Sequence, residues 1–511
     1  MKDAYLKKNK KTGIPVNHMN IFSVAVNMHD HNTYNGKLHY LAERYTRKKH
    51  NLNPTTPHDP EPSREFFREH FLPNYNNKDH MFAFTCSNLG QEFVRDQLED
   101  TLPDLSFLDF TPTNLWDYYK TDDYYYIDHH QSHAAYAFLS SGFKQSDVLA
   151  IDGRGWQFNC IFTDKDGNIT DLTDKVSIGG LWNRMSQKFG FSYLGAGKTM
   201  GLAGFGKYNR VMHYIIDMCM ASPNQRLSDD ASEILKRVPK ENAAFTLQVY
   251  TENLIKKHVY PLKSCDNLCL TGGVAYNGYV NEEFTKHYTN VHVPPAVGDE
   301  GQSLGTYMHA EYTQNNNVHV PDVYAGKEYN YVGEKALDIK EVAQSIADGK
   351  IVGWFQGKSE SGNRALGNRS ILADPRNASI KDIINSTVKM REDFRPFAPA
   401  VLEEHYKQYF DTTSPSPYMS RICKVNPEMK NVIPGVIHVD GTARIQTVNK
   451  KDNSKFYELI REFGEITGVP MLVNTSFNCQ EPIVETPEHA LRTFKKTAID
   501  ILVIGDYVIC K

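Results

Sequence analysis

Short apolar runs that end in Gly, Asp or Asn recur along the chain, and helical patterns separate many of them. Such runs are typical of buried strands that present polar side chains at their ends. The pattern predicts strands at 21–27, 81–86, 124–128, 148–152, 267–271, 291–293, 351–355, 471–474 and 499–504. It predicts helices at 91–98, 133–140, 339–347 and 455–466. The alternation of strands and helices favours an α/β protein.

Polar connecting segments divide these runs. The segments 51–63, 221–230 and 315–326 are candidate linkers, and 411–417 is a loop within the second half. Residues 315–326 follow a helical run and precede a new α/β series, so we place the main domain boundary near residue 325. This predicts two domains, 1–325 and 326–511. We find no strict internal sequence repeat.

Composition narrows the class of protein. Of 511 residues, 40% are hydrophobic and 23% are charged, which excludes wholesale disorder. The 57 Lys and Arg nearly balance the 61 Asp and Glu, so binding of nucleic acid by bulk positive charge is not expected. No apolar run approaches the roughly 20 residues that a membrane span needs. The eight cysteines are scattered, and the basic N-terminus lacks an apolar core, so we expect a cytoplasmic protein.

The segment Asp128–Ala134, DHHQSHA, carries the sharpest chemical signal. His129 and His133 are four residues apart, so on a helix both imidazoles project from one face, as in a two-histidine metal chelate. His130 and His133 are three apart and form an alternative pair. Structural histidines at a helix start are the competing interpretation. Asp152 in IDGRG and Asp299 in GDEGQSLG favour a site for iron, manganese or zinc, because His and Asp together suit such ions.

Several turns after apolar runs are rich in glycine. They are DGRG at 152–155, KTMGLAGFG at 198–206, TGGVAYN at 271–277 and GDEGQSLG at 298–305. Such turns let backbone amides approach phosphates, although each one by itself is as readily an ordinary tight turn. Their repetition resembles the nucleotide cleft of actin-like folds.

Near the N-terminus, NMHDHNTY places His29 and Asp30 at a predicted strand end. A histidine beside an aspartate can act as a general base on an alcohol. A polar strand end without a catalytic role, or a pair that supports a metal site, is the alternative.

The second half concentrates basic residues in an otherwise slightly acidic chain. The cluster comprises Lys358, Arg364, Arg369, Arg376, Lys389, Arg391, Arg395 and Arg444. Arginine binds phosphate and carboxylate groups through two parallel hydrogen bonds, so we expect an anion site here. Structural ion pairs with Glu360, Asp374, Glu392 and Asp393 are the alternative for some of them. The segment that follows a buried run places Asn474, Ser476 and Asn478 on a polar loop.

Together these motifs resemble the O-carbamoyltransferases of the nodulation-factor, cephamycin and tobramycin type. The resemblance runs from about residue 20 to 511, and RALGNRSILADPR, FRPFAP and HVDGTAR are its most specific segments. It implies an actin/hexokinase-like, TsaD-type first domain with two RNase-H-like lobes, and a YrdC-like twisted α/β second domain. By this resemblance, the second domain takes ATP and carbamoyl phosphate and forms carbamoyl-adenylate. The first, with Fe²⁺ or a similar divalent metal, transfers the carbamoyl group to a hydroxyl.

The resemblance also assigns residues. It implies metal ligands at His129, His133, Asp152 and Asp299, and catalytic roles for His29, Asp30 and Arg369. It implies nucleotide and carbamoyl phosphate contacts at Gly272, Gly273, Asn277, Lys358, Arg364, Asn368, Arg395 and Ser476.

The acceptor is left open. The chain reads HNTY after the His-Asp pair and NTSFNCQEPIV in its last motif, where the family has different residues. A small-molecule hydroxyl, on a sugar or antibiotic, is the expected acceptor, and a hydroxymethylated pyrimidine nucleotide or DNA is the alternative. A kinase or ATPase of the actin superfold and a non-enzymatic nucleotide sensor are competing functions. Family members often dimerise, so a homodimer is compatible with the resemblance.

Overall fold

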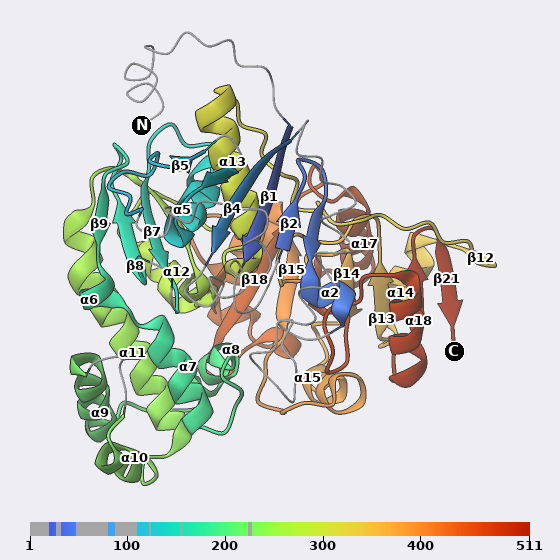
Figure 1. The fold of residues 1–511 in the computed structure, drawn as a ribbon. Coiled ribbons are helices and arrows are strands. Elements are labelled where there is room, and N and C mark those ends of the chain that lie inside the picture. Colours follow the sequence, from blue (N-terminus) through green and yellow to red (C-terminus); the bar gives the residue numbers. More distant parts are fainter. Residues whose placement is uncertain are drawn as a thin grey trace. The chain divides into compact units, whose positions relative to one another are not determined.

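A computed structural model describes residues 20–26, 32–47, 80–86, 110–121, 124–153, 155, 157–222 and 227–511. The contacts divide the chain into two compact units. Unit 1 comprises 1–180, 254–276 and 284–327; unit 2 comprises 181–253, 277–283 and 328–511. Figure 1 shows the elements of both units in one ribbon. Among the described residues, no helix combines the length and apolar character needed to cross a bilayer.

Unit 1 contains two sheets. The strands of the first are β1 (Asn20–Val26), β2 (Asn32–Tyr34), β3 (His39–Leu41), β4 (His80–Cys86), β5 (Tyr119–Lys120) and β6 (Tyr124–Tyr126). The strands of the second are β7 (Asp147–Ile151), β8 (Cys160–Thr163), β9 (Ile169–Asp171), β10 (Asn267–Thr271) and β11 (Asn290–His292). The helices are α2 (Ala42–Thr46), α5 (His129–Ser140), α6 (Thr173–Val176) and α13 (Gln302–Asn315), with short 3₁₀ turns at Tyr260–Leu262, Gly273–Tyr276 and Asp299–Gly301.

The two sheets of unit 1 repeat one strand order. The first is ordered β3-β2-β1-β4-β6-β5 and the second β9-β8-β7-β10-β11. In each, three antiparallel strands are followed by two that run parallel to the third, and β5 adds a sixth, antiparallel strand to the first sheet. Helix α5 packs against β7 and β10, α13 packs against β1 and β4, and the two helices pack on each other. The sequence does not reveal this repetition.

Unit 2 is built on one ten-stranded mixed sheet, in the order β12-β21-β20-β13-β14-β19-β15-β18-β17-β16. Its strands are β12 (Lys335–Ala336), β13 (Val352–Phe355), β14 (Arg369–Ala373), β15 (Ala398–Leu402), β16 (Phe410–Asp411), β17 (Arg421–Val425), β18 (Thr442–Val448), β19 (Met471–Ser476), β20 (Ile501–Ile504) and β21 (Tyr507–Cys510). Its sheet helices are α14 (Ile339–Ala347), α15 (Ile380–Ile384), α16 (Tyr406–Tyr409), α17 (Ser454–Thr467) and α18 (Pro487–Lys496), with a π-turn at Asn385–Lys389 and 3₁₀ turns at Glu403–His405, Pro427–Met429 and Pro434–Val436.

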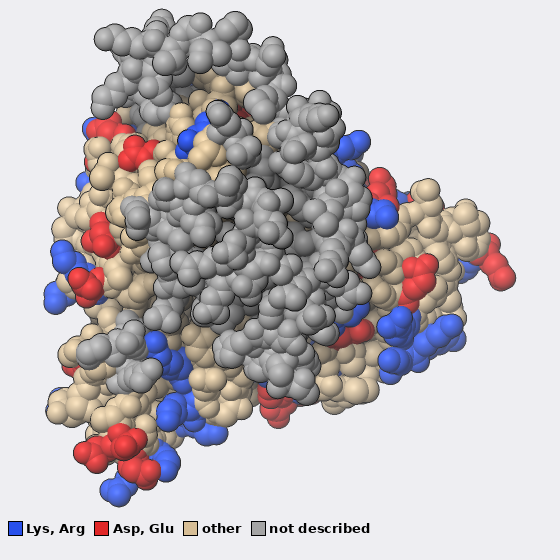
Figure 2. Space-filling view, in the orientation of Figure 1, with Lys and Arg blue, Asp and Glu red and all other residues tan. Residues whose placement is uncertain are grey.

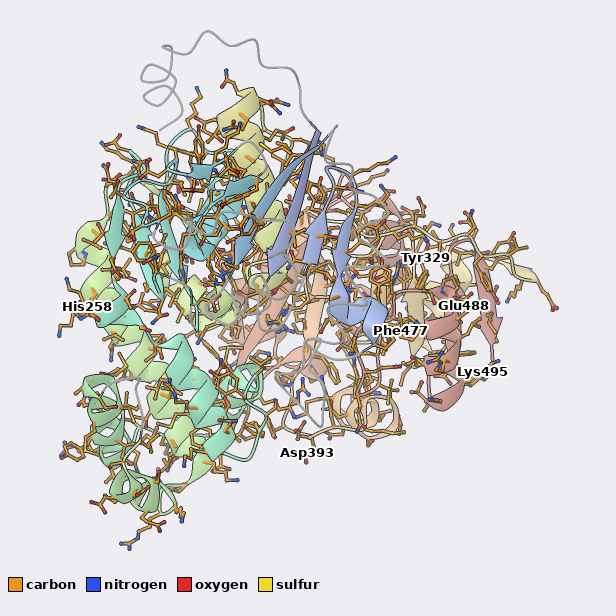
Figure 3. All side chains as sticks on the ribbon, in the orientation of Figure 1. His258, Tyr329, Asp393, Phe477, Glu488 and Lys495 are labelled. Carbon is orange, nitrogen blue, oxygen red and sulfur yellow. The ribbon has the colours of Figure 1, made fainter. Side chains whose placement is uncertain are left out.

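Strand alternation fills both faces of this sheet, because successive side chains point to opposite sides. Trp354 and Leu372 pack with α14 and α17 on one face. Their neighbours Phe355 and Ile371 pack with α15 and α18 on the other. Phe477, just beyond β19, is fully buried in this second core, whereas Glu488 and Lys495 lie on the exposed side of α18 (Figure 3).

The earlier segments of unit 2, 181–253 and 277–283, are mainly helical. Their helices, some of which extend a few residues beyond these bounds, are α7 (Gly179–Lys188), α8 (Ala196–Ala203), α9 (Arg210–Ala221), α10 (Asp229–Leu235), α11 (Lys240–Val259) and α12 (Gly278–Phe284). The sequence pattern did not predict these helices. Around α9 and α10, Lys and Arg are interspersed with Asp and Glu on the face drawn in Figure 2, and Lys236 pairs with Glu233 at 2.5 Å. Charges of both signs therefore share this described surface.

Candidate active site

The start of helix α5 is held by a capping box. The Asp128 carboxylate accepts the backbone N–H of His130 at 2.8 Å, while the Gln131 side chain accepts the backbone N–H of Asp128 at 3.1 Å. Such a cap satisfies N–H groups that the first turn leaves unpaired. The helix therefore begins at His129, four residues earlier than the sequence pattern predicts.

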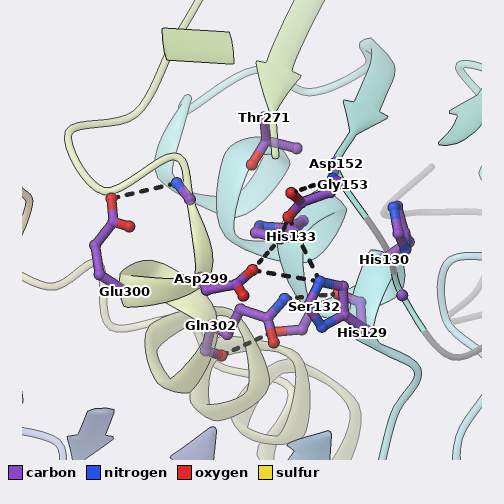
Figure 4. Close-up of polar contacts among 12 residues, drawn as sticks. His129, His130, Ser132, His133, Asp152, Gly153, Thr271, Asp299, Glu300 and Gln302 are labelled. Atoms are coloured by element: carbon purple, nitrogen blue, oxygen red, sulfur yellow. Dashed lines mark hydrogen bonds and ion pairs between the residues drawn. The ribbon is translucent and has the colours of Figure 1, made fainter. Parts of the chain in front are cut away.

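Four predicted metal ligands of unit 1 come together (Figure 4). His129 and His133 lie one turn apart on α5, Asp152 follows β7, and Asp299 opens the turn before α13. Four ligand atoms, one from each residue, lie within 4.8 Å of one another.

The distances between these atoms suit a single cation. His133 Nε2 lies 2.9 Å from Asp152 Oδ2 and 3.4 Å from Asp299 Oδ1. His129 Nε2 lies 3.5 Å from the Asp152 oxygen and 3.4 Å from the Asp299 oxygen. Ligands at about 2.1 Å from one ion are separated by about 3.0–3.4 Å in octahedral or tetrahedral geometry, so this donor set fits a divalent first-row metal.

The electrostatics of the cluster favour positive charge between the carboxylates. Burial would lower the pKa of His129, but Asp299 and Asp152 outweigh it and raise the pKa to about 10. Burial would raise the pKa of Asp152, but hydrogen bonds from His129 and His133 hold it well below its usual range. A divalent cation between the two carboxylates would meet the same demand for charge.

Backbone groups and distant side chains support the two aspartates. Gly153 N donates to Asp152 Oδ1 at 2.5 Å, which leaves Oδ2 toward the histidines. Asn32 of β2 donates to the backbone oxygen of Asp299 at 2.7 Å and accepts the N–H of Ser303 at 3.0 Å. Sequence reasoning missed Asn32, because nothing in its local pattern marks a partner 267 residues away.

The glycine turn after β10 also belongs to this site. Gly272 has a φ of +83°, and a methyl group on it would lie 2.3 Å from the Ile151 backbone oxygen. A methyl group on Gly273 would lie 2.9 Å from Asp152 Oδ1. The turn therefore requires glycine for close approach to the strand end that carries Asp152. Whether these glycines contact a nucleotide stays a prediction.

Other candidates of this half lie outside the cluster. The ring of His130 is fully buried 5.2 Å from that of His129 but belongs to no group of candidate metal ligands among the residues that the structure describes, so His129 and His133 are the pair assembled with the two aspartates. His29 and Asp30 lie outside the described residues.

Unit 2 holds a second site, a cavity lined by both charged and aromatic side chains. The lining residues are Gly197, Met200, Gly201, Gly204, Phe205, Tyr279, Asn363, Arg364, Ala365, Lys381, Arg391, Phe394, Arg395, Pro396, Phe397, Met419, Ile422, Ile437, His438, Val439, Arg444, Asn474, Thr475 and Ser476. Three predicted ligand contacts, Arg364, Arg395 and Ser476, are among them. Lys381 and His438 were not predicted.

The cations of this cavity are crowded. Burial lowers the pKa of Arg444 well below its usual range, and Arg364, Arg391 and Arg395 lower it further. Burial and Arg395 likewise lower the pKa of Arg391 to about 9. Among the residues that the structure describes, no carboxylate forms a salt bridge with Arg444. Repulsion of this kind is relieved by an anion, so the cavity is suited to phosphate.

Some basic residues do form the structural pairs that were the alternative. Arg376 binds Asp374 at 2.6 Å, and Arg395 approaches Glu392 at 3.7 Å. Glu392 also binds Lys198 at 2.7 Å. Asp393 is exposed and is labelled in Figure 3.

Glu360 has a different role from an ion pair. Its Oε1 accepts the backbone N–H groups of Leu366, Asn368 and Arg369 at 2.8, 2.9 and 3.1 Å. These hydrogen bonds stabilise the turn that carries Arg364, which lines the cavity.

The side chains of three predicted site residues, Arg369, Asn368 and Asn277, are engaged away from the cavity lining. The Arg369 guanidinium donates to the backbone oxygens of Gln356, Gly357 and Asn368 and stacks 3.6 Å from the Phe355 ring centre. Asn368 donates to the Lys358 backbone oxygen at 2.8 Å. The Asn277 side chain exchanges hydrogen bonds with Gln248. Ligand contacts for these residues, and catalysis by Arg369, stay predictions.

Comparison with known proteins identifies the class. A family model described as Carbamoyltransferase N-terminus matches residues 76–308, and one described as Carbamoyltransferase C-terminus matches 343–511. The chain belongs to the carbamoyltransferase family, and the protein is a transferase enzyme. The resemblance drawn from the motifs is thereby confirmed.

Relatives of this chain include nodulation proteins and proteins described as uncharacterized. Nodulation protein NolO of Bradyrhizobium diazoefficiens is 34% identical over 75% of this chain and 79% of its own. Protein sll1178 of Synechocystis, described as uncharacterized, is 33% identical over 75% and 76%. Among solved structures, T. kodakarensis HypF covers 59% of this chain and 49% of its own, with 12% identity and a TM-score of 0.33, a likeness too slight to support an argument.

Proposed function

We propose that this carbamoyltransferase is an ATP-dependent O-carbamoyltransferase that activates carbamoyl phosphate as carbamoyl-adenylate. The observation that carries the proposal is the crowded arginine cavity of unit 2, which suits a phosphorylated substrate. The four-residue cluster of unit 1 supports the same chemistry. The repeated strand order in unit 1 supports an actin-like, TsaD-type fold, and the mixed sheet of unit 2 is compatible with a YrdC-like one.

The proposed reaction has three steps. Carbamoyl phosphate and water give carbamate and phosphate. A carbamate oxygen then attacks the α-phosphorus of ATP and releases pyrophosphate. The acceptor hydroxyl attacks the carbamoyl carbon, AMP leaves, and a carbamate ester and one proton remain. The mixed anhydride supplies the leaving group that an alcohol nucleophile needs.

The residues of unit 2 bind and orient the anions in this scheme. Arg364, Arg391, Arg395 and Arg444 hold phosphate oxygens, and Glu360 keeps the turn of Arg364 in place. Such preorganised charge acts on the negative charge that develops at a phosphoryl group.

In unit 1, His129, His133, Asp152 and Asp299 would hold a divalent metal, with Fe²⁺ the first candidate and Mn²⁺ or Zn²⁺ the others. When bound, such an ion supplies Lewis-acid polarisation of phosphoryl and carbonyl oxygens. His29, with Asp30 beside it, takes the hydroxyl proton in this proposal.

The test uses the full chain with ATP, carbamoyl phosphate and Fe²⁺, Mn²⁺ or Zn²⁺. We expect carbamoyl phosphate-dependent release of AMP and pyrophosphate. Release of ADP alone would overturn the adenylation step and favour an actin-superfold kinase or ATPase.

The acceptor requires a second experiment. Mass spectrometry should detect one added carbamoyl group on a small-molecule alcohol, with sugars and antibiotics as the first candidates. Hydroxymethylated pyrimidine nucleotides and DNA are the alternative acceptors. If DNA is the acceptor, binding should weaken steeply with added salt, since released counterions drive such binding.

A further inference from the structure

Asn474, a lining residue of the cavity of unit 2, has a side-chain amide whose orientation is fixed by hydrogen bonds. It lies on β19, is 1% exposed and lines the cavity. Its Nδ2 donates to the backbone oxygen of Ala365 at 3.1 Å and to Gln446 Oε1 at 2.7 Å. Gln446 in turn donates through Nε2 to the Leu366 oxygen at 2.9 Å, which fixes both amide orientations.

This network leaves one atom of Asn474 unused. Its Oδ1 is buried and has no hydrogen-bond partner among the residues that the structure describes. A buried acceptor without a partner costs about 1–3 kcal/mol, so a donor from a ligand is the natural complement.

His438, which also lines the cavity, provides a second acceptor whose protonation pattern is set by a hydrogen bond. Thr442 donates its hydroxyl hydrogen to Asp440 at 2.7 Å, so its oxygen accepts from His438 Nδ1 at 3.0 Å. His438 Nε2 then carries a lone pair, is buried, and has no partner among the described residues. Arginine and lysine side chains only donate. A ligand that satisfies this cavity therefore carries anionic oxygens together with hydrogen-bond donors, either N–H or O–H.

Carbamoyl phosphate has this combination in a small molecule. Its amino group and its phosphate are separated by a single carbonyl carbon and the bridging oxygen. The Asn474 amide is hydrogen-bonded to the backbone oxygen of Ala365, the residue that follows Arg364, so the side chain of β19 is tied to the turn that carries Arg364. The adenine amino group of ATP is much farther from the phosphates, so it fits this short spacing less well.

We propose that Asn474 is a specificity-determining residue that accepts an N–H from the amino group of carbamoyl phosphate and thereby rejects acyl phosphates that lack it. The inference rests on the proposed function. Acetyl phosphate is the matched probe, because it has the same charge and nearly the same shape but carries a methyl group. A site that hydrogen-bonds an N–H discriminates strongly against an analogue without one.

The test compares the dissociation constants of carbamoyl phosphate, acetyl phosphate and inorganic phosphate by calorimetry on the full chain. We expect the wild type to bind carbamoyl phosphate at least about tenfold more tightly than acetyl phosphate. In Asn474→Leu, the two affinities should converge to within about twofold. Phosphate affinity should be unchanged, which also shows that the variant is folded. The control Asn426→Leu removes another amide that donates to two backbone oxygens, Lys407 and Gln408, and should keep the preference.

Three results would overturn the proposal for Asn474, and a fourth would refute the proposed function. Equal binding of the two acyl phosphates by the wild type overturns the proposal even if Asn474→Leu fails to fold. Retention of the preference in Asn474→Leu also overturns it. If that variant instead loses a preference for ATP over inosine triphosphate, Asn474 serves the purine and the proposal is wrong. Failure of the wild type to bind either carbamoyl phosphate or phosphate refutes the proposed function itself.

Discussion

At the residue scale, the candidate metal centre depends on four side chains from three separate segments of unit 1. The sequence marks them through the H-x-x-x-H spacing and through aspartates at glycine-rich strand ends. Those patterns name the donors because local geometry determines which face of a helix or which strand end a side chain occupies. Asn32 could not be found in this way, because its bond to the Asp299 backbone depends on the packing of β2 near the start of α13.

We predict that His133→Ala abolishes tight metal binding, because it removes one of the two imidazoles that lie beside both carboxylates, and the one nearest to Asp152. Affinity for Mn²⁺ or Zn²⁺ should fall by at least about 100-fold, as judged by titration and by metal content after gel filtration. His213→Ala, at a 37% exposed side chain in unit 2, is the control. Equal metal content in both variants would contradict the assignment.

Gly273→Ala should weaken metal binding through Asp152. The added methyl group would meet Asp152 Oδ1 at 2.9 Å and displace it. We expect a loss of about 10-fold in metal affinity with the fold retained. In Gly142→Ala the new methyl group meets nothing within 4 Å, although φ is +72°. That control should lose stability through backbone strain while its metal affinity stays the same, so a similar affinity loss in both variants would refute the mechanism.

At the element scale, strands and helices with clear local stops were predicted well, whereas the helical segment 179–259 was not. Strand β10 and helix α14 have the predicted bounds, because an apolar run or a helical periodicity with clear stops defines each locally. The helices between 179 and 259 escaped prediction. The sequence of α8, AGKTMGLA, contains two glycines, which have low helix propensity and are typical of loops. This helix forms because it packs within unit 2.

His309 of helix α13 should make the stability of the protein depend on pH. His309 donates from Nε2 to the Leu115 backbone oxygen at 2.7 Å and accepts from the Tyr125 hydroxyl at 2.6 Å. Burial outweighs that bond and the charge of Asp117 and lowers the pKa of His309 to about 4. Between about pH 6.5 and 4 the unfolded chain therefore takes up a proton that the native state does not, so stability falls as pH falls.

The measurement is the free energy of unfolding in urea from pH 7 to 4.5. His309→Gln should be less stable at pH 7 but should lose less stability on acidification, by about 2 kcal/mol. Parallel losses in the wild type and the variant would show that other groups determine the acid response.

At the scale of the whole molecule, the two units carry different chemistry. The donor set of unit 1 suits a cation and the cavity of unit 2 suits an anion, although the net charge of the chain is only -4. Composition averages these opposite sites, so it excluded a basic nucleic-acid protein without indicating either site.

Replacing Arg444 should increase the stability of the unliganded protein and weaken its binding of phosphate. Because Arg444 lies with three other arginines and without a carboxylate partner among the described residues, Arg444→Met should raise the free energy of unfolding by about 1 kcal/mol without ligand. It should also abolish the stabilisation that phosphate gives the wild type. Urea unfolding with and without phosphate measures both effects.

Arg376→Met is the matched control for that variant. It breaks the pair with Asp374, whose side chain is 8% exposed, and should therefore destabilise the protein while leaving the phosphate effect intact. If the Arg444 variant is destabilised to the same extent, Arg444 is a structural residue and not part of an anion site.

By itself, the sequence determined the α/β class, the family, the four candidate metal donors and the concentration of arginines, because spacing and residue chemistry are local properties. Tertiary structure decided which arginines line the cavity and which pair, since Arg376 finds Asp374 whereas Arg444 finds other arginines. It also decided the repeated strand order of unit 1 and the fixed acceptor of Asn474. These features depend on contacts between segments far apart in the chain, and no local pattern encodes such contacts.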